Sequence, residues 1–214
     1  MIRLVVFDLD GTLIDSRLDL CLAVNHALRL VDLPERSTDE IAAFVGEGAA
    51  RLVERAVSPH VEVFDRALAA WWTYYQAHLL DNTLLYPGLG SLLADAPFRM
   101  AVHTNKPGSM ARRILGGLHV LDRFVEVVGG DEAARKPDPG GTRDILARQG
   151  VASTEAVLVG DSLVDLATAR AVPVRFVPVG WGLVAPERLL AAGAPAPARS
   201  AADLRRSLGL APAA

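Results

Sequence analysis

The chain has 214 residues, of which 51% are hydrophobic, and its 22 basic and 25 acidic residues give a formal net charge of -3. This length lies between one and two average domains, and the composition is that of a globular protein rather than a disordered chain. The charge balance leaves no excess of basic residues for sequence-independent binding of nucleic acid, so we expect no nucleic-acid partner.

The first residues and the cysteine content indicate a cellular compartment. Cys21 is the only cysteine, which excludes an internal disulfide and suits a reducing environment. The apolar run at the N-terminus is interrupted by Asp8 and Asp10 and is too short and acidic for a signal peptide. No stretch reaches the roughly 18 uncharged apolar residues that a transmembrane helix needs. We therefore expect a cytoplasmic protein without a membrane partner.

Short apolar runs alternate with longer helical patterns along most of the chain. The runs predict strands at residues 4–7, 100–103, 124–128, 156–159 and 174–177, and the helical patterns predict helices at about 109–118, 141–149 and 163–170. Continuous apolar strands that alternate with helices are typical of a parallel sheet covered on both faces. With right-handed connections, this predicts an α/β, doubly wound, Rossmann-like fold.

Residues 16–85 interrupt this alternation, because their pattern is helical throughout and shows no convincing strand. The turn signal at residues 86–88 returns the chain to the sheet. We predict a catalytic α/β core at 1–15 and 86–214, with an inserted all-helical cap at 16–85. The Ala/Pro-rich tail after Gly182 is expected to be peripheral, with a helical fragment at 204–208 and a weak or missing last strand at 194–200.

Polar residues follow each predicted strand at its carboxyl end, where open parallel sheets bind their ligands. These residues are Asp8 and Asp10 after the first strand, Thr104, Asn105 and Lys106 after the second, Lys136 beyond the third, and Asp161 and Asp165 after the fourth. Carboxylates gathered at one point require a cation, and hard oxygen ligands with room for water and phosphate suit Mg²⁺. Lysine and hydroxyl groups would then hold phosphate oxygens.

This arrangement predicts phosphate-ester hydrolysis with a division of roles. Asp8 would attack phosphorus, while Asp10 would protonate the leaving oxygen. Hydrolysis of phosphate monoesters needs an acceleration of up to about 10²¹-fold, of which one positioned acid supplies roughly 10²–10⁴. A nucleophile, a metal ion and a charge clamp must therefore share the remainder.

The four motifs together resemble those of the haloacid dehalogenase superfamily. They are Asp8-Leu9-Asp10-Gly11-Thr12, Thr104-Asn105-Lys106, Lys136-Pro137 and Gly160-Asp161-Ser162-x-x-Asp165, and they occur in the family's order. The resemblance implies that Asp8 is nucleophile and Mg²⁺ ligand, that Asp10 is general acid/base and gives its carbonyl to the metal, and that Lys136 bridges nucleophile and phosphoryl group. It further implies that Thr104 and Asn105 bind the phosphoryl group, that Asp161 ligates Mg²⁺, and that Asp165 supports the site.

A narrower resemblance concerns the predicted cap. Its segment Phe44-Val45-Gly46-Glu47-Gly48-Ala49 is similar to that of bacterial phosphoglycolate phosphatases. Glycines at 46 and 48 would let backbone amides approach a short substrate such as 2-phosphoglycolate closely. We therefore expect a small phosphoester substrate bound by Gly46 and Gly48, and a monomer or homodimer. Arg51 is a weaker candidate for binding the substrate carboxylate.

Other functions remain open at this stage. The same fold would suit a phosphatase for sugar phosphates, nucleotides or pyrophosphate, a phosphomutase, or a non-catalytic protein that binds phosphorylated metabolites. Individual residues also have structural interpretations: Thr104 as a helix cap, Asp165 as a surface carboxylate, Lys136 as a solvated lysine. The aromatic residues 71, 72, 74 and 75 are expected to pack within the cap, and the five histidines lack the spacing of a metal site.

Overall fold

A five-stranded parallel sheet forms the centre of the computed structural model, which describes residues 1–211. The strands are β1 (Leu4–Phe7), β4 (Arg99–His103), β5 (Glu126–Val128), β6 (Ala156–Gly160) and β7 (Arg175–Pro178), in the order β5-β4-β1-β6-β7. Central β1 pairs with β4 on one side and with β6 on the other. All four of its residues are buried, as expected for a strand covered on both faces. The predicted fold class is confirmed.

Helices cover both faces of this sheet, and the alternation of β1 side chains divides the core in two. Val5 and Phe7 share one cluster with side chains of α5 (Leu89–Asp95), α6 (Gly108–Gly117) and α10 (Ala201–Ser207). Leu4 and Val6 share the other with α7 (Gly140–Gln149), α8 (Leu163–Ala171) and α9 (Pro186–Ala191). Successive strand residues point to opposite faces, so a four-residue apolar run supports both layers.

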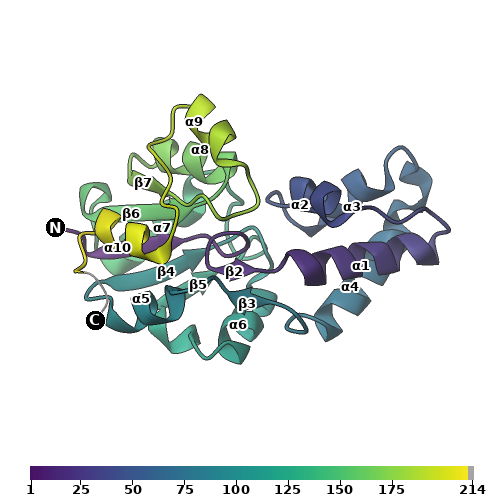
Figure 1. The fold of residues 1–214 in the computed structure, drawn as a ribbon, viewed down its shortest axis with the longest axis horizontal. Helices are drawn as coiled ribbons and strands as arrows, with labels where there is room; N and C mark the ends of the chain where they lie inside the picture. The colour runs from purple at the N-terminus through teal and green to yellow at the C-terminus, as the bar shows by residue number, and fades with distance from the viewer. Residues whose placement is uncertain (212–214) are drawn as a thin grey trace.

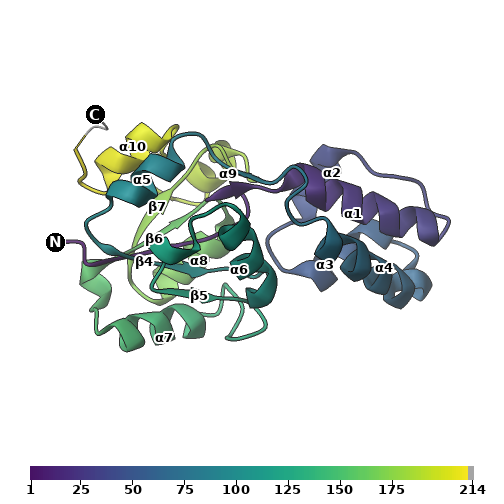
Figure 2. The same cartoon turned by 90° about the horizontal axis from the view of Figure 1, so that it is seen from below.

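Residues 16–85 form a helical insert that lies beyond one end of the sheet (Figures 1 and 2). Its helices are α1 (Arg17–Leu30), α2 (Thr38–Phe44), α3 (Ala49–Val57) and α4 (Phe64–Ala77). Helix α1 packs along α4, and its Cys21 is buried. We use the name helical insert for these residues and the name sheet body for residues 1–15 and 86–211. That the two are separate domains stays a prediction.

The absence of a strand in residues 16–85 was a wrong prediction. Leu84–Leu85 forms the short strand β3, which pairs antiparallel with β2 (Ile14–Asp15). The pair joins the chain segment that enters the insert to the segment that leaves it. Two residues are too few to show an alternating pattern, so the pairing left no periodic signal in the sequence.

The prediction of a peripheral tail after Gly182 was also only partly correct. Leu189 in α9 and Leu204 in α10 are fully buried, and Leu208 is nearly so, which makes these helices part of the core. The expected weakness of the last strand is borne out, because Ala198 forms only an isolated bridge with Val179 in the described residues. The many alanine and proline residues of this segment weaken the helical pattern in the sequence. One leucine on each helix, Leu189 and Leu204, nevertheless packs into the core.

Candidate active site

Asp8 stands directly after β1, the central strand, at the edge of the sheet that faces the insert. Its backbone N–H donates to the carbonyl of Val159 on β6 (2.9 Å), which carries the sheet pairing one residue past the strand. Asp161 follows β6, and Asp165 lies in the first turn of α8. Parallel neighbouring strands therefore bring Asp8 and Asp161 to the same edge, as the topology predicts.

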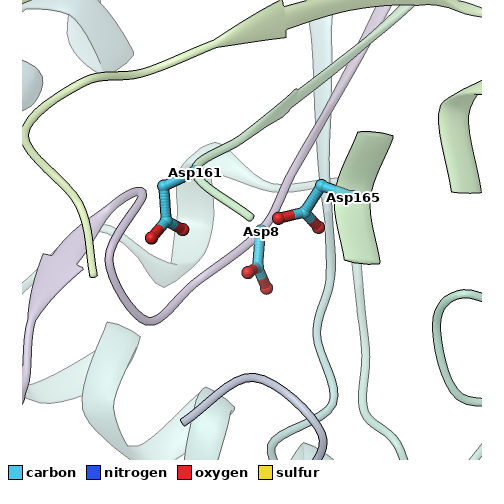
Figure 3. A group of neighbouring side chains, drawn as sticks. All are labelled: Asp8, Asp161 and Asp165. Atoms are coloured by element: carbon cyan, nitrogen blue, oxygen red, sulfur yellow. The ribbon is translucent and has the colours of Figure 1, made fainter. Parts of the chain in front are cut away.

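The side chains of Asp8, Asp161 and Asp165 are neighbours at this edge of the sheet (Figure 3). One oxygen from each lies within 4.8 Å of the others. Burial raises the pKa of Asp8 to about 8, with Asp165 and Asp161 adding to the rise and Lys136 opposing it. Burial and the nearby charge of Asp165 raise the pKa of Asp161 to about 7. Buried carboxylates that repel one another in this way suit a bound cation.

Asp161 is held rigidly between two loops. The hydroxyl of Thr12 donates to its Oδ1 (2.9 Å), and the backbone N–H of Leu183 donates to its Oδ2 (2.7 Å). Gly11 and Gly182 lie against the same carboxylate, where a Cβ atom would stand 2.4 and 2.3 Å from its Oδ2. Only glycine fits at these two positions, so the loop after β7 closes tightly on the site.

Lys136 is buried and joins two of the carboxylates. Its Nζ lies 2.8 Å from Asp8 Oδ1 and 2.6 Å from Asp165 Oδ1. Burial alone would lower the pKa of Lys136, but the charges of Asp165 and Asp8 raise it above its ordinary value. The lysine is therefore charged, and it is not a solvated loop residue. Asp165 is fully buried, which likewise excludes its interpretation as a surface carboxylate.

The side-chain amide of Asn105, which follows β4, is fully engaged within the protein. Its Oδ1 accepts from the backbone N–H of Lys136 (2.9 Å), and its Nδ2 donates to the carbonyls of Lys136 (2.9 Å) and Gly46 (2.8 Å). Asn105 thus positions the Lys136 backbone and contacts the insert at Gly46. Neighbouring Thr104 is buried and directs its Oγ1 to the backbone N–H of Lys106 (3.2 Å).

Asp10 has two partners. The hydroxyl of Ser16 donates to Asp10 Oδ1 (2.5 Å), and the same oxygen lies 3.2 Å from Lys106 Nζ. Lys106 in turn donates to the hydroxyl of Tyr75 on α4 (2.6 Å). A line of contacts therefore runs from the insert through Lys106 to Asp10.

A small pocket of about 40 Å³ lies where the insert meets this edge of the sheet. The sheet body lines it with Asp8, Asp10, Thr104, Asn105, Lys106 and Pro107. The insert lines it with Leu20, Val45, Gly46, Gly48, Ala49, Leu52 and Trp71. Gly46 and Gly48 have φ values of 122° and 91°, in the region that favours glycine. The structure therefore brings both glycines into the pocket with Asp8 and Asp10, whereas Lys136 does not line it.

The sequence placed Lys106 at the sheet edge without an individual role, and Trp71 and Tyr75 were expected to pack within the cap. Trp71 and Tyr75 do stack on each other, with ring centroids 4.8 Å apart, but Trp71 also lines the pocket and Tyr75 holds Lys106. The position of Lys106, directly after Asn105, was the available signal. Arg51 lies elsewhere: it pairs with Glu54 on the surface of α3 (2.6 Å) and does not line the pocket.

His103, the last residue of β4, has a structural environment. Its Nδ1 lies 2.9 Å from Thr142 Oγ1. A Cβ atom on Gly141 would stand only 2.4 Å from its Nε2, so the ring packs tightly against this glycine. Burial and the nearby positive charge of Lys136 lower the pKa of His103 to about 3. The ring is therefore neutral, and it packs against the start of α7 rather than facing the carboxylates.

In residues 1–211, no helix is both long enough and apolar enough to cross a membrane.

Comparison with curated proteins finds close relatives over most of the chain. A phosphoglycolate phosphatase of Rhodospirillum rubrum is 40% identical over 196 residues, which cover 85% of this chain and 81% of that protein. One from Colwellia psychrerythraea is 36% identical over 194 residues, covering 84% and 85%.

Solved structures show the same architecture. A predicted phosphoglycolate phosphatase from Haemophilus somnus matches with a TM-score of 0.81 at 30% identity, covering 85% of this chain and 86% of that one. A predicted phosphatase from Clostridium acetobutylicum matches with a TM-score of 0.86 at 24% identity, covering 97% and 98%, and supports the fold alone. The sequence profile of the haloacid dehalogenase-like hydrolases matches residues 5–179. The chain therefore belongs to the haloacid dehalogenase-like hydrolase family and is an enzyme related to phosphoglycolate phosphatases.

Proposed function

We propose that this enzyme hydrolyses the phosphomonoester of a small metabolite, 2-phosphoglycolate, through an aspartyl-phosphate on Asp8. The observation that carries the proposal is the buried group of Asp8, Asp161 and Asp165 with Lys136 between two of its members. The phosphoglycolate phosphatases among its relatives, up to 40% identical, support the choice of substrate.

The donor atoms at the site suit Mg²⁺. Carboxylates of Asp8 and Asp161, with the backbone carbonyl of Asp10, would hold the cation, and water and substrate would supply further oxygens. The pairing of Asp165 with Lys136 leaves Asp165 a supporting role. When bound, the cation offsets the charge of the carboxylates and of the phosphate oxygens. The raised pKa values of Asp8 and Asp161 support this proposal, because a bound cation would stabilise their ionised forms.

In the proposed reaction, Asp8 attacks phosphorus and forms an acyl phosphate while the P–O bond to the leaving group breaks. Asp10 gives its proton to the departing oxygen, and then takes one from the water that attacks the aspartyl-phosphate. Lys136 and Thr104 would hold the phosphoryl oxygens. The side-chain amide of Asn105 is committed to Lys136 and Gly46, so Asn105 would reach the phosphoryl group through its backbone N–H.

We also propose that the insert acts as a cap that closes over the substrate. At the pocket, hydrogen bonds join the insert to the sheet body from Asn105 to the carbonyl of Gly46 and from Lys106 to the hydroxyl of Tyr75. Such contacts can break and form again during turnover. Small-angle scattering with and without a phosphate mimic and Mg²⁺ tests this, since identical profiles would contradict closure.

The substrate is tested by phosphate release from 2-phosphoglycolate, sugar phosphates, a nucleotide, pyrophosphate and an aryl phosphate, each with Mg²⁺ and with a chelator. We expect metal-dependent release with a preference for 2-phosphoglycolate. Equal rates on all esters would retain the hydrolase and remove the substrate assignment. Release of phosphate that a chelator leaves unchanged would contradict the metal.

A further inference from the structure

Lys106 is a buried cation on the pocket wall whose bonding capacity is only partly used. Its Nζ donates to Tyr75 Oη (2.6 Å) and lies 3.2 Å from Asp10 Oδ1. An ammonium group carries three N–H donors, so one remains for a group in the pocket. Burial raises the pKa of Tyr75 to about 12, which keeps its hydroxyl protonated beside the lysine.

No other Lys or Arg among the described residues lines this pocket. Lys136 is occupied by Asp8 and Asp165, at the place proposed for the phosphoryl group. Arg51, the cationic residue of the insert that the sequence suggested, is 60% exposed in its side chain and bound to Glu54. Any second negative charge on a substrate in this pocket therefore has Lys106 as its cationic partner.

Trp71 supplies an independent indication of a ligand at the same place. The residue lines the pocket and is only 2% exposed, yet its indole Nε1–H has no hydrogen-bond partner. A buried donor without a partner is costly, and such donors in native proteins call for an explanation. Trp71 stacks on Tyr75, the residue that holds Lys106, so Tyr75 contacts both donors.

The remaining insert side of the pocket is apolar. Leu20 and Leu52 line it together with backbone at Gly46 and Gly48. These side chains offer no hydrogen bonds to the hydroxyl groups of a sugar. The wall therefore combines one cation and one N–H donor with an apolar surround, and it suits a short organic group that ends in an anion.

We propose that Lys106 and the Trp71 indole N–H form a subsite for the substrate carboxylate, and that this subsite determines specificity. The inference rests on the proposed function and assigns the recognition of the second anionic group to two residues, one from each side of the pocket. Tyr75 acts as a positioning residue, because it holds Lys106 and touches no substrate atom.

The test compares 2-phosphoglycolate with ethyl phosphate, which has the same number of carbon atoms and lacks the carboxylate. The quantity measured is the ratio of the two kcat/KM values. We expect Lys106→Met to lower this ratio about a hundredfold and Trp71→Phe to lower it about tenfold, as for lost charged and neutral hydrogen bonds. Arg51→Met is the matched control, and we expect its ratio to equal that of the wild type.

Binding gives a readout that does not depend on turnover. Calorimetric titration of the Asp8→Asn variant with 2-phosphoglycolate and Mg²⁺ is repeated in the double variant that also carries Lys106→Met. We expect affinity for 2-phosphoglycolate to fall about a hundredfold, with affinity for ethyl phosphate changing far less. Thermal unfolding of each variant identifies any that do not fold, and Trp71→Phe then carries the test.

The outcomes separate the subsite from the proposed function. A high wild-type ratio that Lys106→Met and Trp71→Phe leave unchanged would overturn the subsite and retain 2-phosphoglycolate as substrate. A wild-type ratio near one, with active hydrolysis of other esters, would overturn the substrate assignment and the subsite together. A ratio that falls in Arg51→Met as much as in Lys106→Met would also contradict the subsite.

Discussion

The two sides of the pocket differ in chemistry. On the sheet body, the Nζ of Lys136 lies 2.8 Å from Asp8, and Asp161 accepts hydrogen bonds at 2.7–2.9 Å from Thr12 and the backbone of Leu183. On the insert, the lining is apolar apart from one indole N–H and the backbone of a glycine loop. The side that is rigid and charged suits bond breaking, and the side that is apolar suits selection of the leaving group.

This difference predicts two kinds of variant. Changes at Asp8, Asp161 or Lys136 of the sheet edge should reduce turnover of every phosphoester, because each substrate shares the phosphoryl group. Lys106 belongs instead with the residues proposed to select the substrate. Changes in the insert should alter the choice among substrates, because only the leaving group reaches it. Variants of the first kind therefore have the larger effects on rate.

The largest effect is expected from Asp8→Asn. The amide is a poor nucleophile and carries no charge for the metal, so kcat should fall about 10⁴-fold or more on all substrates. Phosphate release at saturating Mg²⁺ measures it, with thermal unfolding as a check on the fold. Asp95→Asn, a change at a residue on α5 far from the pocket lining, is the control. Near-wild-type turnover in a pure Asp8→Asn preparation would remove Asp8 as nucleophile.

Gly182→Ala should have the next largest effect. A Cβ there would stand 2.3 Å from Asp161 Oδ2, so the carboxylate or the loop must move. A displacement of about 1 Å at a catalytic group costs about a hundredfold in rate, and we expect that loss together with weaker Mg²⁺ activation. Gly90→Ala is the matched control, because its Cβ would meet Leu85 Cδ1 only at an ordinary 4.0 Å. Equal activity of the two variants would contradict a rigidly held Asp161.

The free energy of unfolding of the metal-free protein should fall as the pH rises from about 6.5 to about 8, a range above the ordinary pKa of His103, whose lowered pKa has the opposite effect at lower pH. The pKa values of Asp8 (about 8) and Asp161 (about 7) lie above the ordinary value of 3.8, so the folded state binds more protons than the unfolded state in this range. The contribution of Asp8 and Asp161 to the free energy of unfolding is fully present below pH 3.8. It is lost as the pH rises through their pKa values in the folded protein, about 8 and 7. Mg²⁺ should offset the loss, since it binds the deprotonated carboxylates.

Melting temperatures measured with Mg²⁺ and with chelator between pH 5 and 8 test this prediction. The gain from Mg²⁺ should be larger at pH 8 than at pH 5. A constant gain, or stability that increases between pH 6.5 and 8 in the chelated protein, would contradict the raised pKa values of Asp8 and Asp161.

The smallest effect on rate is expected from Asp19→Ala, which acts at the junction of insert and sheet body. Asp19 is buried in α1 and accepts four hydrogen bonds, from the backbone and side chains of Asn82 and Thr83. Its loss leaves buried donors unpaired, so the free energy of unfolding should fall by about 3 kcal/mol. Rates on all esters should change less than tenfold.

Urea unfolding and kcat/KM for 2-phosphoglycolate measure the two quantities. Asp81→Ala is the control, because that exposed residue pairs only with His78 in the described structure. A stability loss no greater than the control's would contradict the role of Asp19 in joining the two chain segments.

The sheet edge was predictable because each of its residues stands next to a pattern the sequence displays. Asp8 and Asp161 directly follow apolar strands, and parallel strands end at one edge, so order along the chain determines their meeting. The position of Asp165 was predictable because it lies in the first turn of the helix that follows β6. Lys136 lies on a loop beyond the third predicted strand; its position along the chain placed it near this edge, and only the family resemblance gave its bridging role.

The insert was less predictable, because its contributions depend on contacts between elements distant in sequence. Tyr75 and Lys106 are separated by 31 positions and meet only when the helices of the insert pack over the sheet. An aromatic residue at a helical spacing has the same pattern whether it fills a core or lines a pocket. The short strand β3 was not predicted, because two residues are too few to show an alternating pattern.

The most direct test of the account is to find the phosphoryl group on Asp8. The enzyme is mixed with 2-phosphoglycolate and Mg²⁺, quenched in acid during turnover, digested and analysed by peptide mass spectrometry; the Asp10→Asn variant, slowed in breaking down the intermediate, is treated in parallel. We predict the mass of one phosphoryl group on the peptide that contains Asp8, more of it in Asp10→Asn, and none in Asp8→Asn. Turnover that leaves this peptide unmodified in both forms, or a phosphoryl group on another residue, would contradict the account.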